Sequence, residues 1–170
     1  NIITIIRIIL TPIFVVFLLS NGPHSKLIAT IIFFLASLSD AFDGKIARKY
    51  GVETRFGKFL DPLADKILIL SALISFVYIG YVKIWMFLLI FFRDILITLL
   101  RYFMQYKGLT MNTSNFGKVK TVFQVIAINI ILFYLINKSY HISIVINFFV
   151  EYPVIDFVMF ITTFVTVLTG

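Results

Sequence analysis

Long apolar runs dominate this chain, and their length restricts its possible folds more than any other feature. A helix needs about 20 residues to cross the ~30 Å hydrocarbon core of a bilayer, and the runs here are close to that length. Turn-forming pieces such as NGPHS and KGLTMNTSN separate them. We therefore expect six helices, over residues 2–19, 26–48, 58–80, 82–107, 113–136 and 153–169.

The composition supports a membrane protein built of helices. Hydrophobic residues make up 61% of the chain, 20 of its 170 residues are Phe, and only 14% are charged. A soluble domain of this size could not bury so much apolar side chain. We expect an all-α fold, a bundle of six transmembrane helices that forms a single domain over residues 1–170. The chain has no Cys, which excludes disulfides, thiolate metal sites and Cys nucleophiles.

Lys and Arg side chains give the expected bundle an orientation, because cytosolic segments carry an excess of them. If the N-terminus is cytosolic, the inner side holds Arg7, Lys45, Arg48, Lys49, Arg55, Lys58, Lys66, Arg93, Arg101, Lys107, Lys118 and Lys120. Only Lys26, Lys83 and Lys138 remain outside. Both termini are therefore expected in the cytosol. The segment HISIVINFFVEY is too short to span, and we expect it to lie in the interface.

Four aspartates interrupt this apolar chain. Asp40 and Asp43 are three residues apart, and Asp61 and Asp65 are four apart, so each pair projects from one face of a helix. Carboxylates at membrane depth persist when they face a polar cavity and are paired. Because the chain offers oxygen ligands here and neither His nor Cys, the pairing partners that the sequence favours are Mg²⁺, Mn²⁺ or Ca²⁺.

Residues with little or no side chain accompany the aspartates. Gly44 and Ala47 share the face of the first pair, and Gly57 shares that of the second, so a bulky ligand or a neighbouring backbone could approach closely. Arg48 lies one turn beyond Gly44 and could reach phosphate oxygens with both arms of its guanidinium. Metal ligands, glycine and arginine together predict a pyrophosphate site.

These residues follow the pattern D-x2-D-G-x2-A-R-x8-G-x3-D-x3-D at every fixed position. The residues that match it are Asp40, Asp43, Gly44, Ala47, Arg48, Gly57, Asp61 and Asp65. In this respect the chain resembles the CDP-alcohol phosphatidyltransferase family. A chance match of so many positions with fixed gaps in a polytopic membrane chain is improbable, and the length and topology extend the resemblance to the whole chain.

The resemblance implies a metal-dependent transferase with its active-site cavity on the cytosolic side. It implies that Asp40, Asp43, Asp61 and Asp65 hold two divalent ions, Mg²⁺ or Mn²⁺, on the pyrophosphate of a CDP-linked donor. Asp65 is implied as the base that takes the proton of the acceptor hydroxyl, and Gly44, Ala47, Arg48 and Gly57 as the nucleotide lining. The opening N-x2-T-x2-R, at Asn1, Thr4 and Arg7, also matches; its role is contact with the nucleotide or a headgroup, or capping of the first helix.

Four basic residues indicate an anionic acceptor. Arg93 and Arg101 share one face of the fourth expected helix, and Lys118 and Lys120 begin the fifth, so they could form a phosphate pocket at the cytosolic mouth. The alternative is that they snorkel to the interface. Asp94 is expected to orient Arg93. The sequence of this region and the segment RFGKFLDPLADK are most similar to the corresponding sequences of bacterial family members that use sn-glycerol 3-phosphate.

The sequence thus predicts transfer of a phosphatidyl group from CDP-diacylglycerol to sn-glycerol 3-phosphate, with release of CMP, in a bacterial cytoplasmic membrane. Another acceptor such as inositol phosphate or serine is the alternative within the family. A divalent-cation transporter is a remote alternative, because Arg48 among the ligands would repel a permeating cation. No nucleic-acid partner is expected, because the basic residues are spread through apolar helices. Family members are commonly homodimers, so a homodimer is a further possibility.

Overall fold

The computed structural model describes residues 2–22, 24–50, 55–107 and 115–169; the side chains of 2–4, 39–50, 55–63, 65, 101–102, 105–106 and 115–118 lie outside the described part. Seven helices and no strand occur in the described ranges, so the predicted all-α class is confirmed. The helices are α1 (Ile2–Leu19), α2 (Ser25–Tyr50), α3 (Arg55–Ile79), α4 (Ile84–Tyr106), α5 (Asn115–Ser139), α6 (Ser143–Glu151) and α7 (Val154–Leu168).

The seventh helix arises from the segment predicted to be too short to span. This segment forms α6, which has no buried residues and bends by 57° from α7. Pro153 precedes the first turn of α7, where its fixed φ and missing N–H suit a helix start. The other helices begin and end within a few residues of the predicted bounds.

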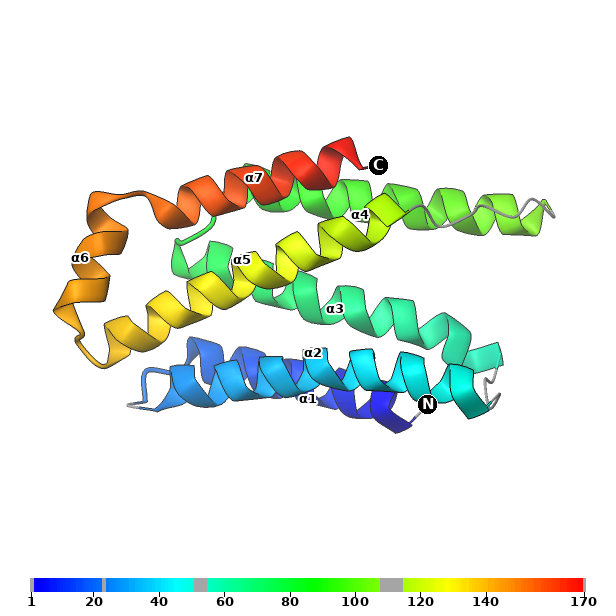
Figure 1. The fold of residues 1–170 in the computed structure, drawn as a ribbon, viewed down its shortest axis with the longest axis horizontal. Helices are drawn as coiled ribbons and strands as arrows, with labels where there is room; N and C mark the ends of the chain where they lie inside the picture. Colours follow the sequence, from blue (N-terminus) through cyan, green and yellow to red (C-terminus); the bar gives the residue numbers. More distant parts are fainter. Residues whose placement is uncertain (1, 23, 51–54, 108–114, 170) are drawn as a thin grey trace.

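The helices form two packed groups that meet along α5. Helix α1 packs against α2 and α3, α7 packs against α4 and α5, and α5 also contacts α2 and α3 (Figure 1). Large buried side chains from several helices fill the centre, among them Phe14, Phe33, Phe76 and Leu132. The rings of Phe14 and Phe33 lie 5.5 Å apart. The core therefore runs along the bundle between α1, α2, α3 and α5.

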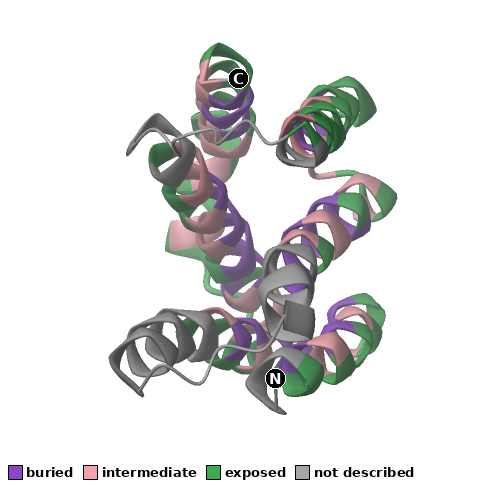
Figure 2. Cartoon of the chain, turned by 90° about the vertical axis from the view of Figure 1, so that its right-hand side faces the viewer, coloured by how far each residue is buried: buried purple, intermediate pink, exposed green. Residues whose placement is uncertain are grey.

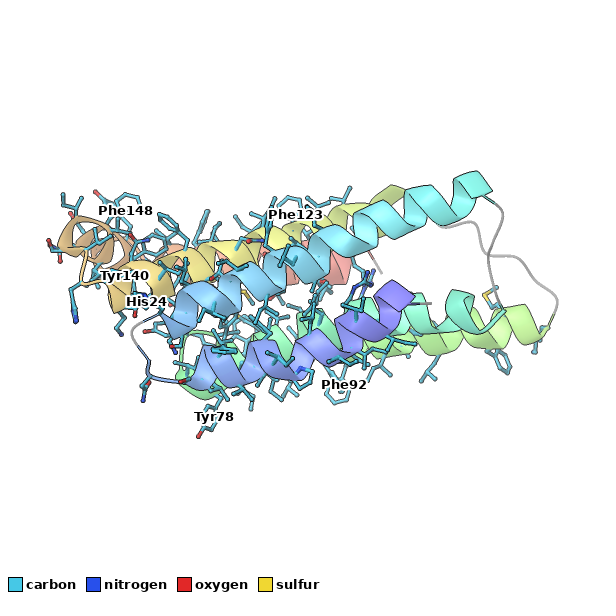
Figure 3. All side chains as sticks on the ribbon, turned by 90° about the horizontal axis from the view of Figure 1, so that it is seen from below. His24, Tyr78, Phe92, Phe123, Tyr140 and Phe148 are labelled. Carbon is cyan, nitrogen blue, oxygen red and sulfur yellow. The ribbon has the colours of Figure 1, made fainter. Side chains whose placement is uncertain are left out.

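The outside of the bundle is apolar. Figure 2 shows the buried faces turned inward and the exposed faces outward, and the exposed faces carry large hydrophobic side chains such as Val16, Phe92 and Leu99. Tyr78 and Phe92 project away from the bundle in Figure 3. A soluble protein rarely exposes apolar surface of this extent. Among the described helices, Val119–Ser139 is long and apolar enough to cross a bilayer, and the bent pair α6 and α7 would be a second span.

The bundle has two distinct ends. One end is formed by the start of α1, the end of α2, the start of α3, the end of α4 and the start of α5, and the C-terminal end of α7 points toward it (Figure 1). We call it the aspartate end, because it includes the segments of Asp40, Asp43, Asp61 and Asp65. At the opposite end Gly80 turns the chain from α3 into α4 with a φ of 88°, a conformation that glycine adopts without steric strain.

Candidate active site

The backbone places the four predicted metal ligands in two adjoining helix ends. Asp40 and Asp43 lie within about three turns of the end of α2, and Asp61 and Asp65 within about three turns of the start of α3. The backbone is helical at all four positions, as their spacing requires. A connection of four residues, 51–54, joins the two helices, which keeps these ends close. The four aspartate side chains lie outside the described part, so their role as ligands stays a prediction.

The register of α2 relates the first pair to the core. Ala29, Phe33 and Ala36 are fully buried and form one stripe along α2. Steps of four and three residues continue this stripe to Asp40 and Asp43. The first pair therefore continues the same helical stripe whose earlier members, Ala29, Phe33 and Ala36, are buried in the bundle.

The register of α3 leads to the same result for the second pair. Ala64, Leu68 and Ala72 are buried on α3. Asp61 lies three residues before Ala64, and Asp65 lies three residues before Leu68. Ala64 directly precedes Asp65 and is only 1% exposed. A small buried residue at this point agrees with the predicted close approach of neighbouring groups along this face.

Arg7 is a buried cation near the first aspartate pair. Arg7 is 2% exposed, and its Nε donates a hydrogen bond of 3.2 Å to the carbonyl oxygen of Ala36 on α2. Ala36 lies one helical turn before Asp40. Arg7 itself lies inside α1 and contacts α2, while the role of the opening motif as a whole stays a prediction. Asn1 and the side chain of Thr4 lie outside the described part.

A second buried polar group joins α4 and α5. The side chain of Asp94 is 6% exposed, that of Arg93 is 11% exposed and that of Lys120 is 13% exposed. Arg93 Nη1 donates to Asp94 Oδ1 over 3.0 Å, and Lys120 Nζ donates to the same oxygen. We call these three residues the acidic-centred cluster. It satisfies the expectation that Asp94 orients Arg93.

Lys66 ties the aspartate helix α3 to this cluster. Its Nζ donates to Thr98 Oγ1 and, over 3.4 Å, to the carbonyl oxygen of Asp94. Thr98 Oγ1 in turn donates to that carbonyl oxygen over 2.6 Å. Because Lys66 directly follows Asp65, these bonds fix the distance between the segment of the predicted base and the acidic-centred cluster.

The cluster has capacity for an anionic ligand. Arg93 Nε is buried and has no hydrogen-bond partner, although buried polar atoms nearly always have one. Arg93 and Lys120 both contact the single carboxylate of Asp94, so two cations lie close together here. An anion bound beside Arg93 would satisfy this nitrogen.

The predicted acceptor residues are thus partly brought together. Arg93 and Lys120 meet at Asp94, while the side chains of Arg101 and Lys118 lie outside the described part of α4 and α5. Among the polar contacts that the sequence did not predict are those of Thr98 and of the buried Gln124, which donates to Thr166 on α7 over 3.4 Å. An isolated Thr or Gln in an apolar helix gives no sequence signal beyond its polarity.

Polar residues at the opposite end form pairs of their own. His24 is exposed there beside Tyr140, with 2.6 Å between its Nδ1 and the Tyr140 hydroxyl (Figure 3). Lys83 and Asp156 form an exposed ion pair of 3.2 Å at the rim of a hollow of about 280 Å³. These groups are far along the bundle from the acidic-centred cluster and add nothing to the candidate site.

Comparison with known proteins identifies similar sequences over the whole chain. The model of a family described as CDP-alcohol phosphatidyltransferase matches residues 1–168. A CDP-diacylglycerol--glycerol-3-phosphate 3-phosphatidyltransferase from Bacillus subtilis (strain 168) is 35% identical over 182 residues, which cover 100% of this chain and 90% of that protein. One of the same name from Rickettsia bellii (strain RML369-C) is 35% identical over 170 residues, with coverage of 100% and 90%. A probable phosphatidylglycerophosphate synthase from Mycobacterium tuberculosis (strain ATCC 25618 / H37Rv) is 40% identical over 133 residues, 76% of this chain and 63% of that protein.

Proposed function

Because this chain belongs to the CDP-alcohol phosphatidyltransferase family, we propose that it transfers a phosphatidyl group from CDP-diacylglycerol to sn-glycerol 3-phosphate. The products are phosphatidylglycerophosphate and CMP, and the protein is a membrane transferase of phospholipid biosynthesis. The names of the relatives support this reaction. The structural observation that carries it is the buried, positively charged pair of Arg93 and Lys120, because such a pair suits an acceptor that carries a phosphate.

The four aspartates hold two divalent ions, which are Mg²⁺ or Mn²⁺. Carboxylate oxygens are the ligands that these hard cations prefer, and the helical register of α2 and α3 supports a shared site for Asp40, Asp43, Asp61 and Asp65. When bound, the ions neutralise charge on the donor's pyrophosphate. The buried Arg7 beside Ala36 adds a fixed positive charge close to the same segment of α2.

Small residues and one arginine receive the nucleotide of the donor. Gly44, Ala47 and Gly57 leave room for it, and Arg48 binds its phosphate oxygens. Asn1 and Thr4 contribute from the start of α1. The start of α1 lies at the aspartate end, where α1 packs on α2 (Figure 1), which supports this assignment.

The acceptor's phosphate lies at the acidic-centred cluster. Arg93 Nε, which is buried and without a partner, donates to a phosphate oxygen, and Lys120 supplies charge from α5. Arg101 follows Arg93 by eight residues on α4, and Lys118 precedes Lys120 on α5. These two residues complete the pocket toward the aspartate end.

The transfer is a direct displacement at the phosphorus of the phosphatidyl group. The acceptor's hydroxyl oxygen forms a bond to that phosphorus, the bond from the phosphorus to the oxygen of CMP breaks, and Asp65 takes the hydroxyl proton. Lys66 and Thr98 hold the Asp65 segment next to the acceptor cluster. No covalent enzyme intermediate is required.

The bundle spans the bacterial cytoplasmic membrane with six segments and has both termini and the active site on the cytosolic side. The apolar exterior supports the membrane location. The excess of Lys and Arg at the aspartate end supports the orientation. A homodimer formed through membrane helices agrees with the apolar outer face of α4.

A panel of acceptors tests the proposed reaction. Purified protein in vesicles that contain CDP-diacylglycerol and Mg²⁺ receives sn-glycerol 3-phosphate, inositol phosphate or serine, and CMP release is measured. We expect the fastest release with sn-glycerol 3-phosphate and very little with serine, which lacks the phosphate that Arg93 and Lys120 would bind. A clear preference for inositol phosphate or serine would overturn the choice of acceptor, and no CMP release with any of them would overturn the reaction.

A further inference from the structure

Asp94 is a buried carboxylate in a mostly apolar stretch of α4. It is 5% exposed and lies in the sequence FFRDILITLL. Removing a carboxylate from water is unfavourable unless charged partners replace the lost hydration. Arg93 and Lys120 are such partners. The question is whether this arrangement only stabilises the fold or also prepares the two cations for a ligand.

The geometry favours preparation for a ligand. Both cations approach the same oxygen, Asp94 Oδ1, from two different helices. Two cations so close together repel each other, and a carboxylate between them removes this repulsion. Arg93 uses Nη1 for Asp94 and keeps its buried Nε without a partner. If Arg93 only balanced the charge of Asp94, its buried Nε would be expected to have a hydrogen-bond partner as well.

The backbone of Asp94 is fixed as well. Its carbonyl oxygen accepts hydrogen bonds from Thr98 Oγ1 and from Lys66 Nζ. Lys66 belongs to α3, next to Asp65. The position of Asp94 is therefore set relative to both α3 and α5, the two helices that would bring the base and the second phosphate-binding cation.

We propose that Asp94 is a positioning residue that holds Arg93 and Lys120 together as a preformed phosphate-binding pair. Asp94 does not touch the acceptor itself. It fixes the guanidinium of Arg93 so that Nε faces the phosphate, and it keeps the ammonium of Lys120 beside it before the acceptor arrives. This inference rests on the proposed function in so far as the phosphate is that of sn-glycerol 3-phosphate.

Asp94→Asn tests the proposal, because it keeps the shape of the side chain and removes its charge. We expect KM for sn-glycerol 3-phosphate to rise roughly 10- to 100-fold, the range that follows from weakening charge-assisted hydrogen bonds, with KM for CDP-diacylglycerol little changed. Asp94→Glu restores the carboxylate and should recover most of the acceptor affinity. Asp156→Asn is the matched control, since it removes a carboxylate from the exposed ion pair with Lys83 at the opposite end and should leave both KM values unchanged.

A binding measurement tests the pair without turnover. Inorganic phosphate should raise the melting temperature of the detergent-solubilised wild type, because a ligand that binds the folded state stabilises it. Asp94→Asn should abolish this increase, and Asp94→Glu should retain it. If the wild type released no CMP with sn-glycerol 3-phosphate, the proposed function would fail while this phosphate measurement would still decide the role of Asp94.

Two results would overturn the proposal. One is an Asp94→Asn protein that melts at a lower temperature but keeps its acceptor KM and its stabilisation by phosphate, because Asp94 would then serve the fold alone. The other is an equal rise in KM for donor and acceptor. If Asp94→Asn does not fold, the double variant Asp94→Asn with Lys120→Gln removes both charges of one ion pair; an acceptor KM and phosphate response equal to those of the wild type would again overturn the proposal.

Discussion

At the scale of single residues, the distribution of charge separates two tasks. Carboxylates at Asp40, Asp43, Asp61 and Asp65 continue buried stripes of α2 and α3, whereas cations gather around Asp94 on α4 and α5. Anionic side chains suit divalent ions, and cationic side chains suit a phosphate. The proposed donor would therefore be bound through divalent ions at the carboxylates, whereas the proposed acceptor would contact the cations directly.

Substitution of two aspartates should distinguish the base from the metal ligands. Asp65→Asn keeps the size of the side chain and an oxygen for the metal but cannot take a proton, so we expect turnover to fall ~10²–10⁴-fold, the usual contribution of a general base. Binding of CDP-diacylglycerol with Mg²⁺ should persist. Asp43→Asn should instead weaken the metal-dependent binding of the donor. Turnover at saturating substrates and donor binding to the purified variants measure the two effects.

The assignment of Asp65 depends on that contrast. Near-normal turnover of Asp65→Asn at saturating substrates would contradict its role as base, and another carboxylate would have to take the proton. Loss of donor binding in both variants would make Asp65 primarily a metal ligand. Folding of each variant is checked by its melting temperature in detergent.

At the scale of helices, the contact between α3 and α4 connects the two groups of the bundle near the site. Lys66 on α3 reaches Thr98 on α4, and Thr98 also donates to the carbonyl oxygen of Asp94. A hydrogen bond between helices in a membrane protein stabilises it by about 0.6 kcal/mol on average and up to about 1.7 kcal/mol. This contact is therefore more important for alignment than for the total stability.

Thr98→Val tests that alignment, because it removes the hydroxyl with almost no change in volume. We expect the free energy of unfolding to fall by about 1 kcal/mol and turnover to fall more than the affinity for CDP-diacylglycerol. Thr30→Val is the matched control. Its hydroxyl makes the same bond to the carbonyl four residues earlier, that of Lys26, but Thr30 ties no second helix. Equal effects of both substitutions on turnover would contradict the alignment role of Thr98.

The sequence predicts elements better than contacts between them. Apolar runs determine the helix bounds closely because each run is one helix long, and HISIVINFFVEY forms the separate short helix α6. Arg93 and Lys120 were predicted as partners because charges in an apolar helix are conspicuous. The hydrogen bond from Lys66 to Thr98 depends on how α3 crosses α4, and the one from Gln124 to Thr166 depends on how α5 crosses α7. Helix periodicity does not determine crossing, so these contacts needed the structure.

At the scale of the whole molecule, the apolar exterior indicates a membrane location, and the difference in charge between the two ends predicts an orientation. Exposed Val, Ile, Leu and Phe side chains surround it. Most Lys and Arg residues belong to the segments that lead to the aspartate end, and α6 lies at the opposite end (Figure 1). This asymmetry predicts that the aspartate end faces the cytosol.

Cysteine labelling tests the orientation directly, because the chain has no Cys of its own. Tyr140→Cys lies at the exposed opposite end, and Lys107→Cys lies at the exposed end of α4. In intact cells a membrane-impermeant maleimide should label the protein changed at Tyr140 and spare the one changed at Lys107 until the membrane is permeabilised. The reverse pattern would place the aspartate end outside and contradict the predicted topology.

Metal-dependent synthesis of one lipid tests the central claim most directly. Purified protein is mixed with CDP-diacylglycerol vesicles and sn-glycerol 3-phosphate, and the lipid product is identified by mass spectrometry with Mg²⁺ present or with excess EDTA. We predict phosphatidylglycerophosphate and an equal amount of CMP with Mg²⁺, neither with EDTA, and recovery of both when Mg²⁺ is restored, since the four aspartates are proposed to act through divalent ions. Full synthesis in excess EDTA, or CMP release without phosphatidylglycerophosphate, would contradict the account.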